Sequence, residues 1–239
     1  MCNPAIYSSK LSLEDSNVLK GIALALLLIH HLFGIPSTEG FYNDIVVGNH
    51  GIVNEIGRGC KLCVAIFVFL SGYGLTVQTE NRGEIGSLTH FYRHRLLKLL
   101  LNYWFIWLIF VPIGVLVFGR TLLGTYHDHF FIKLIADVLG VAYAFGFYGY
   151  NATWWFLSCI IVYYLFYPIL YILIKRYQFE SLILFISLAL LPIIVEQQEI
   201  VRYALPFVLG IYFAIRGIPI VGGQILCTPS YGCRTNFVW

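Results

Sequence analysis

Long runs without a charged side chain constrain the fold of this sequence more than any other feature. Residues 64–70 and 183–195 carry no charge and do not alternate between apolar and polar positions as the strands of a membrane β-barrel do. Only 11% of the residues are charged and 59% are hydrophobic, whereas about a quarter of a soluble domain is charged. The sequence therefore predicts an all-α, polytopic transmembrane helical bundle in the cell membrane.

The hydropathy pattern predicts about six spans, because a membrane-crossing helix needs about 20 apolar residues. The predicted spans are residues 18–35, 60–79, 96–118, 154–174, 179–196 and 201–218. Polar residues precede the first of them, and it has no small-residue cleavage site. We therefore interpret it as a permanent span and not as a signal peptide.

The distribution of basic residues predicts the orientation of the chain, because cytoplasmic loops carry an excess of Lys and Arg. With the N-terminus in the cytoplasm, the basic segment 82–98 is also cytoplasmic. If the apolar segment 131–148 crossed the membrane, Lys175 and Arg176 would lie outside. We therefore expect 131–148 to be an interfacial or re-entrant helix, with a crossing helix as the alternative.

Other classes of protein receive little support from the sequence. Two residues separate Cys60 from Cys63, but no second pair follows at zinc-finger spacing, so we expect no metal site. The net charge of +3 does not indicate a nucleic-acid surface. We divide the chain into residues 1–221, which carry the spans, and a non-spanning, aberrant tail at 222–239.

The first span contains ionisable side chains at membrane depth. Lys20 and His31 are eleven positions apart, close to three helical turns, so they share one helix face with His31 roughly 16 Å further along the axis. Such groups usually face a protein interior or a water-filled cavity. His30 points about 100° away, which favours a structural or lipid-facing role. The pattern predicts a polar path into the bilayer.

Four segments, taken in order, carry a resemblance to a known family. The Lys20–His31 spacing comes first, and a Phe-rich segment ending in Ser71-Gly72-Tyr73 follows. The third segment, 91–98, is the basic start of the third span, and the fourth, 154–158, reads Trp-Trp-Phe-Leu-Ser. Over roughly residues 15–215 the chain resembles the membrane acyltransferase-3 family.

This resemblance implies a function. Members of the family move acyl groups, commonly acetyl, from a cytoplasmic donor to sugars or other acceptors outside the membrane. It implies acyl-CoA (acetyl-CoA) as the donor substrate, no bound cofactor, an extracytoplasmic carbohydrate or similar acceptor, and contact with membrane lipid. Fuller members have more spans, so we expect this chain to be an N-terminal part, truncated near residue 221.

The resemblance also suggests roles for individual residues. His31 would be catalytic, either as the base that takes the proton of the acceptor hydroxyl or as a transient acyl carrier. Lys20, Arg95 and Lys98 would bind the phosphates of the donor. The family often has Arg where Lys20 and Lys98 stand, and Lys lacks the bidentate fork of Arg, so donor binding would be weaker or differently arranged.

Ser71, Tyr73 and Trp155 are predicted to line the pocket. A nucleophilic role for Ser71 is disfavoured, because a nucleophile elbow needs Gly at positions 69 and 73, where Phe and Tyr stand. Two alternatives to the acyltransferase stay open. One is a proton-coupled transporter in which His31 relays protons, and the other is an inactive remnant.

Overall fold

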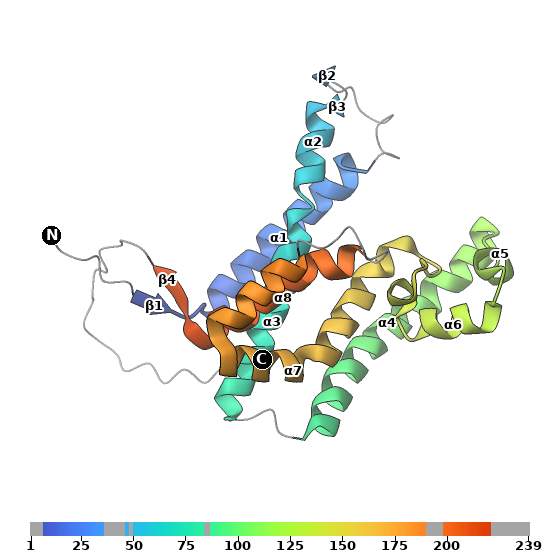
Figure 1. The fold of residues 1–239 in the computed structure, drawn as a ribbon. Coiled ribbons are helices and arrows are strands. Elements are labelled where there is room, and N and C mark those ends of the chain that lie inside the picture. Colours follow the sequence, from blue (N-terminus) through green and yellow to red (C-terminus); the bar gives the residue numbers. More distant parts are fainter. Residues whose placement is uncertain (1–6, 36–45, 48–49, 84–86, 190–197, 221–239) are drawn as a thin grey trace. The chain divides into compact units, whose positions relative to one another are not determined.

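The structure is a computed structural model that describes residues 7–35, 46–47, 50–83, 87–189 and 198–220. Figure 1 shows the chain as a set of helices with a few short strands. The helices are α1 (Leu13–Phe33), α2 (Ile52–Gly59), α3 (Leu62–Arg82), α4 (Leu88–Phe118), α5 (Leu122–Tyr126), α6 (Phe130–Val138), α7 (Trp155–Ala189) and α8 (Gln198–Arg216), with 3-10 turns η2 (Ala142–Phe145) and η3 (Ala152–Trp154). Strand β1 (Tyr7–Ser9) pairs antiparallel with β4 (Ile218–Ile220), and β2 (Val46–Val47) pairs with β3 (His50–Gly51).

Four stretches of the described chain are long and apolar enough to cross a membrane. They are Leu13–Phe33, Ile52–Arg82, Leu88–Phe118 and Ala152–Tyr177. Each contains most or all of one of the first four predicted spans, which confirms the helical membrane fold. The predicted span 201–218 corresponds to most of α8, whereas part of 179–196 and the whole tail 222–239 lie outside the described residues.

Helical residues also occur outside the predicted spans. We expected a connection at 175–178, but α7 continues through it to Ala189. Charged side chains mark the end of an apolar run without ending a helix, and no Gly or Pro stands between residues 169 and 189. Residues 52–59, which lie between the first two predicted spans, form α2, where Arg58 donates to Glu55 at 3.0 Å.

The segment 131–148 does not form one long helix. Helix α6 has nine residues, or roughly 14 Å, and a hydrocarbon core is roughly 30 Å thick. Gly140, with φ of +71°, ends the helical path, and η2 follows. A positive φ is readily adopted only by glycine. This geometry agrees with an interfacial or re-entrant segment and not with a crossing helix.

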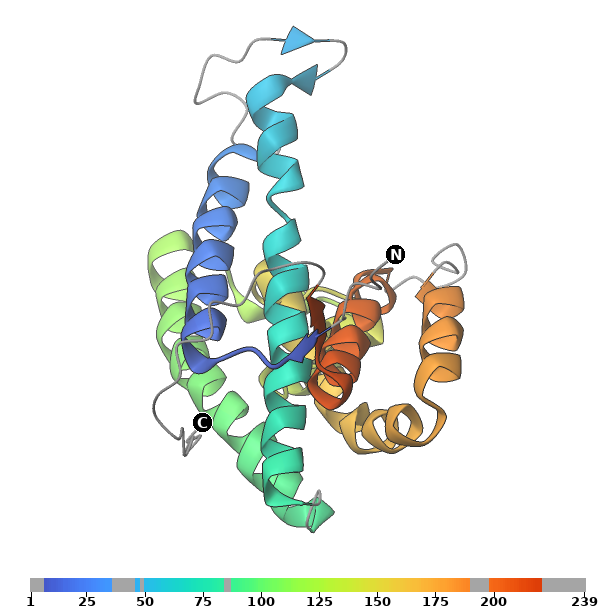
Figure 2. The same ribbon diagram turned by 90° about the vertical axis from the view of Figure 1, so that its left-hand side faces the viewer.

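The chain forms two compact units, which are described separately. The first comprises residues 1–81 and 209–239. In it α1 lies beside α2 and α3, as Figure 2 shows. The core of this unit includes Tyr73, Val77 and Ala214, and partly buried Phe69 and Phe213 pack against them. A Cβ atom on Gly210 would overlap the backbone of α3, so the missing side chain allows α3 and α8 to approach closely.

The second unit comprises residues 82–208 and contains a compact cap at the end of α4. The cap consists of α5, α6 and η2 (Figure 1). Its core is formed by Val111, Tyr126 and Tyr150. The Trp104 indole donates to the carbonyl of Val138 at 2.7 Å, which ties α6 to α4.

Candidate functional site

Helix α1 begins with a capping box that its sequence encodes. The Ser12 hydroxyl accepts from the Asp15 backbone N–H at 3.0 Å, and the Asp15 carboxylate accepts from the Ser12 N–H at 2.9 Å. Acidic residues in this first turn also suit the positive end of the helix dipole. From there the helix runs regularly to Phe33, so Lys20 and His31 share one face as the spacing predicts.

The end of α1 is held against α2 by His30. The carbonyl of Gly57 lies 3.0 Å from His30 Nδ1, and since a carbonyl only accepts, Nδ1 carries the proton in this bond. Asn54 donates to the carbonyl of Phe33 at 2.9 Å. Gly34 and Gly57 face each other with no room for a Cβ atom. His30 therefore has the structural role that its position on the helix suggested.

His31 lies on a different side of α1 from this contact. Its ring centroid is 5.5 Å from that of His30, and both His31 and Lys20 are exposed. The ring of His31 is therefore accessible to another partner. The geometry is compatible with chemistry at His31.

The beginning of α4 places its basic residues in two different environments. Arg95 is half-buried, and the hydroxyls of Tyr164 and Tyr167 on α7 are among its electrostatic neighbours. Lys98 is exposed and lines an open hollow of about 440 Å³. The two predicted donor ligands on this helix are thus on neighbouring faces with different surroundings.

The predicted pocket residues on α3 lie in the first unit. Tyr73 is only 1% exposed, and its hydroxyl accepts the Leu11 backbone N–H at 2.8 Å. Tyr73 therefore anchors the segment before α1 to α3 as part of the core. Ser71 is half-buried two residues earlier on the same helix, and its role in a pocket stays a prediction.

Trp155 begins α7 in an aromatic environment in the second unit. Its ring stacks on that of Tyr203 with centroids 5.9 Å apart. Together with Tyr143 and Ser158 it lines a cavity of about 10 Å³, which has room for about one water molecule. Burial raises the pKa of Tyr143, so its hydroxyl stays protonated well above neutral pH.

A buried carboxylate in the cap has no role in the sequence-based site. Asp137 is 1% exposed and accepts from the hydroxyl of Tyr126 at 2.5 Å and the N–H of Tyr150 at 2.9 Å. Weaker donors are Tyr103 at 3.3 Å and the indole of Trp107 at 3.4 Å. The sequence signal was an Asp inside an apolar segment.

The expected catalytic and donor-binding residues are divided between the two units. Lys20 and His31 belong to the first, and Arg95 and Lys98 belong to the second. Within the described residues, no group of three or more His, Cys, Asp and Glu side chains is arranged to hold a metal ion.

Comparison with known proteins assigns a family to the whole arrangement. A family model described as an acyltransferase domain, of the acyltransferase-3 type, matches residues 13–223, which is most of the chain. No curated protein and no solved structure matches the sequence. The match includes α1 with Lys20 and His31, the basic start of α4, and Trp155 on α7. The chain therefore belongs to the acyltransferase-3 family of membrane acyltransferases.

Proposed function

We propose that this chain transfers an acyl group, most simply acetyl, from acyl-CoA to a hydroxyl of an extracytoplasmic glycan or a similar acceptor. The observation that carries the proposal is the family match over residues 13–223. An exposed histidine on a span that meets the family's spacing supports it.

In the proposed reaction, His31 acts on the acceptor. Its neutral imidazole takes the proton of the acceptor hydroxyl as the oxygen attacks the carbonyl carbon of the thioester. The carbon–sulfur bond then breaks, and the imidazolium returns the proton to the departing CoA thiolate. In the alternative route, a ring nitrogen of His31 attacks the thioester carbon and CoA leaves as the carbon–sulfur bond breaks. The acceptor oxygen then attacks the acyl-imidazole, and the carbon–nitrogen bond breaks to regenerate His31. His30 is assigned a structural role instead, because it holds the Gly57 carbonyl and points about 100° away from the helix face that Lys20 and His31 share.

The cations bind the donor. Lys20, Arg95 and Lys98 attract the phosphates of CoA, and in the proposed topology each lies toward the cytoplasmic end of its helix. Partial burial against α7 restricts the Arg95 side chain, so it loses less freedom when it binds an anion. Ser71 and Trp155 are proposed as pocket residues, and Tyr73 supports the helix from the core.

Acetyl transfer in membranes tests the function directly. Membranes containing the chain are supplied with labelled acetyl-CoA, and label in the glycan fraction is compared between His31→Ala and the matched variant His30→Gln. We expect His31→Ala to lose transfer by about a hundredfold or more, since a general base contributes at least that much. His30→Gln keeps a donor near Gly57 and should retain transfer.

The level of each variant in the membrane is measured in parallel. Equal transfer by His31→Ala and the unchanged chain would exclude the proposed role of His31. If the unchanged chain is stably inserted but transfers no label, the proposed activity is excluded. Proton-coupled uptake by the same membranes would then favour the alternative of a proton-coupled transporter.

A further inference from the structure

The hollow beside the first turns of α4 is lined by basic and by apolar side chains. Its described lining consists of His90, Arg93, His94, Leu97, Lys98, Leu101 and Asn102. His90, His94, Lys98 and Asn102 follow one another at intervals of four residues, so they form one strip along the helix. The rings of His90 and His94 stack with centroids 6.1 Å apart.

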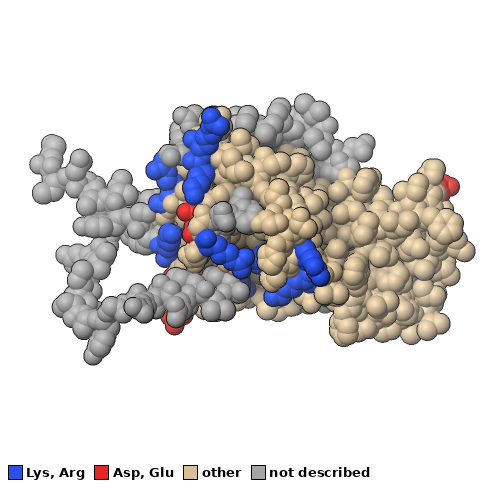
Figure 3. Space-filling model, turned by 90° about the horizontal axis from the view of Figure 1, so that it is seen from below, with Lys and Arg blue, Asp and Glu red and all other residues tan. Residues whose placement is uncertain are grey.

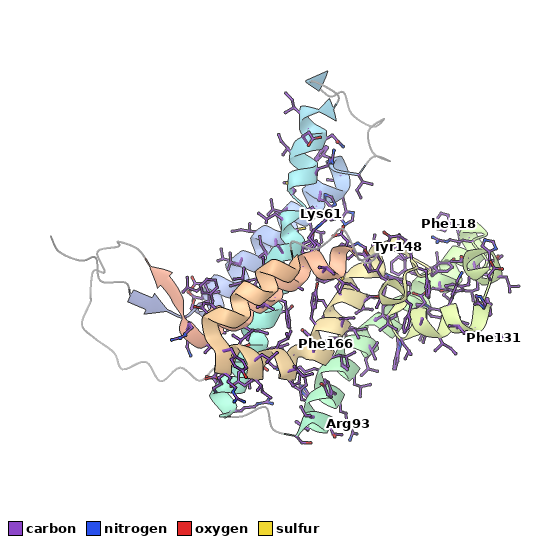
Figure 4. The ribbon with its side chains drawn as sticks, viewed as in Figure 1. Lys61, Arg93, Phe118, Phe131, Tyr148 and Phe166 are labelled. Carbon is purple, nitrogen blue, oxygen red and sulfur yellow. The ribbon has the colours of Figure 1, made fainter. Side chains whose placement is uncertain are left out.

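The hollow has an excess of positive charge. Its described lining includes no Asp or Glu, and α4 has no acidic residue in its first turn. Within the part of the chain that the structure describes, neither Arg93 nor Lys98 makes an ion pair with a carboxylate. Figure 4 labels Arg93 at this end of α4. Figure 3 shows Lys and Arg side chains near the start of α4 and a broad uncharged surface over the cap. The hollow is suited to an anion.

The apolar side of the hollow continues along the helix. Leu97 and Leu101 lie in the hollow, and Phe105 and Leu108 extend the same strip away from the cations. Leu101 is 53% exposed and Phe105 is 67% exposed. On a membrane helix such a strip faces hydrocarbon. A ligand that fits both parts carries a phosphate at one end and an apolar chain at the other.

We propose that this hollow binds the headgroup of an anionic phospholipid, with the phosphate among His90, Arg93 and His94 and an acyl chain along Leu97, Leu101 and Phe105. Clusters of basic residues at the cytoplasmic end of a span bind anionic lipids in this way. The site is distinct from Arg95, which faces α7, and it shares only Lys98 with the proposed donor site. The inference holds whether or not the chain transfers acyl groups.

Native mass spectrometry of the purified full chain in detergent tests the site, with phosphatidylglycerol and phosphatidylcholine as probes. We expect phosphatidylglycerol to bind about tenfold more tightly, and its advantage to shrink at high salt. The variant His90→Gln/Arg93→Gln/His94→Gln should lose this preference. The matched variant Arg176→Gln, which removes an exposed cation on α7, should keep it.

Three results would overturn the assignment. The first is equal binding of both lipids by the unchanged chain, and the second is an unaltered preference in the triple variant. The third is displacement of bound phosphatidylglycerol by soluble CoA, which would assign the hollow to the donor. The single variant Arg93→Gln should show a partial loss, and it provides the same comparison if the triple variant does not fold. Acetyl transfer is measured in a separate assay, so the lipid-binding result can be interpreted even if the proposed acyltransferase activity is not found.

Discussion

At the residue scale, Asp137 makes the most consequential polar contact of the cap. It connects α6 to α4 through Tyr103, to α5 through Tyr126 and to the segment before η3 through Tyr150. All of these partners are neutral donors, which is how a buried carboxylate is satisfied without a cation. Gly149 is required beside it, because a Cβ atom there would overlap the carboxylate.

We predict that Asp137→Ala destabilises the cap. The variant leaves the donors of Tyr126 and Tyr150 buried without an acceptor, and each such group costs about 1–3 kcal/mol. The free energy of unfolding should fall by about 3 kcal/mol or more, as measured by denaturation of the purified protein in detergent. Asp128→Ala changes an exposed carboxylate two residues after Tyr126 and should shift it by less than about 0.5 kcal/mol. Equal effects of the two variants would refute the structural role of Asp137.

A second residue-scale prediction concerns the pH dependence of stability. Burial, followed by the hydrogen bond to Asp137 and its negative charge, raises the pKa of Tyr126 above its ordinary value. The folded protein therefore holds this proton at pH values where the unfolded chain releases it, so stability is lost as pH rises above about 10. Tyr126→Phe should remove about 1.4 kcal/mol per pH unit from that slope. Parallel slopes for the two proteins between pH 10 and 11 would contradict this cause.

At the element scale, the contact between α1 and α2 depends on two glycines without side chains. Helix α2 lies between the first two predicted spans, and Gly57 and His30 attach it to the end of α1. The same helix contains Gly59, which is exposed and has open space around it. Gly57 and Gly59 therefore allow a comparison of the same substitution at a packed and at an open position of one helix.

We predict that alanine has opposite effects at these two positions. A Cβ atom on Gly57 would overlap the backbone of Phe33 and Gly34, so Gly57→Ala should destabilise the protein by about 1–3 kcal/mol. Gly59→Ala should stabilise it by about 0.5–1 kcal/mol, since alanine restricts the unfolded chain and favours the helix. Thermal unfolding in detergent measures both. A stabilising effect at both positions would show that α1 and α2 do not pack through Gly57.

At the scale of the whole molecule, the distribution of basic residues predicts how the chain is oriented in the membrane. The basic start of α4 lies at one end of that span, and the cap follows the other end. Because α6 has only nine residues and 131–148 is not expected to cross, Lys175 and Arg176 are expected on the same side as the start of α4. This predicted topology would place α5, α6 and η2 on the outer side of the membrane.

Cysteine accessibility in intact cells tests the topology. In a background with the six native cysteines replaced, Ser87→Cys should react with an impermeant thiol reagent only after the cells are opened. Thr153→Cys, exposed in η3, should react in intact cells. Both expected labelling results follow from the rule that segments with an excess of basic residues lie in the cytoplasm. Labelling of Ser87→Cys in intact cells would reverse the orientation, and labelling of neither position would place 131–148 across the membrane.

The sequence by itself determined the class of fold, the first four spans and the shared face of Lys20 and His31. These features follow from hydrophobicity and from the 3.6-residue helical period, which are local properties. The short length of α6 agrees with the orientation expected from basic residues alone. Helix α7 continues past residue 175, which hydropathy and charge did not predict. Charged residues indicate where a chain leaves the membrane, but they do not indicate where a helix ends.

Only the tertiary structure decided which polar groups meet. Tyr103 and Asp137 are 34 residues apart, and His30 and Gly57 are 27 apart. No periodicity links such positions, since their contact depends on how separate helices pack. The same holds for Arg95 and Lys98, which are near neighbours in the sequence but face α7 and an open hollow respectively. Local sequence specifies each helix, and the packing of the helices specifies the partners of its side chains.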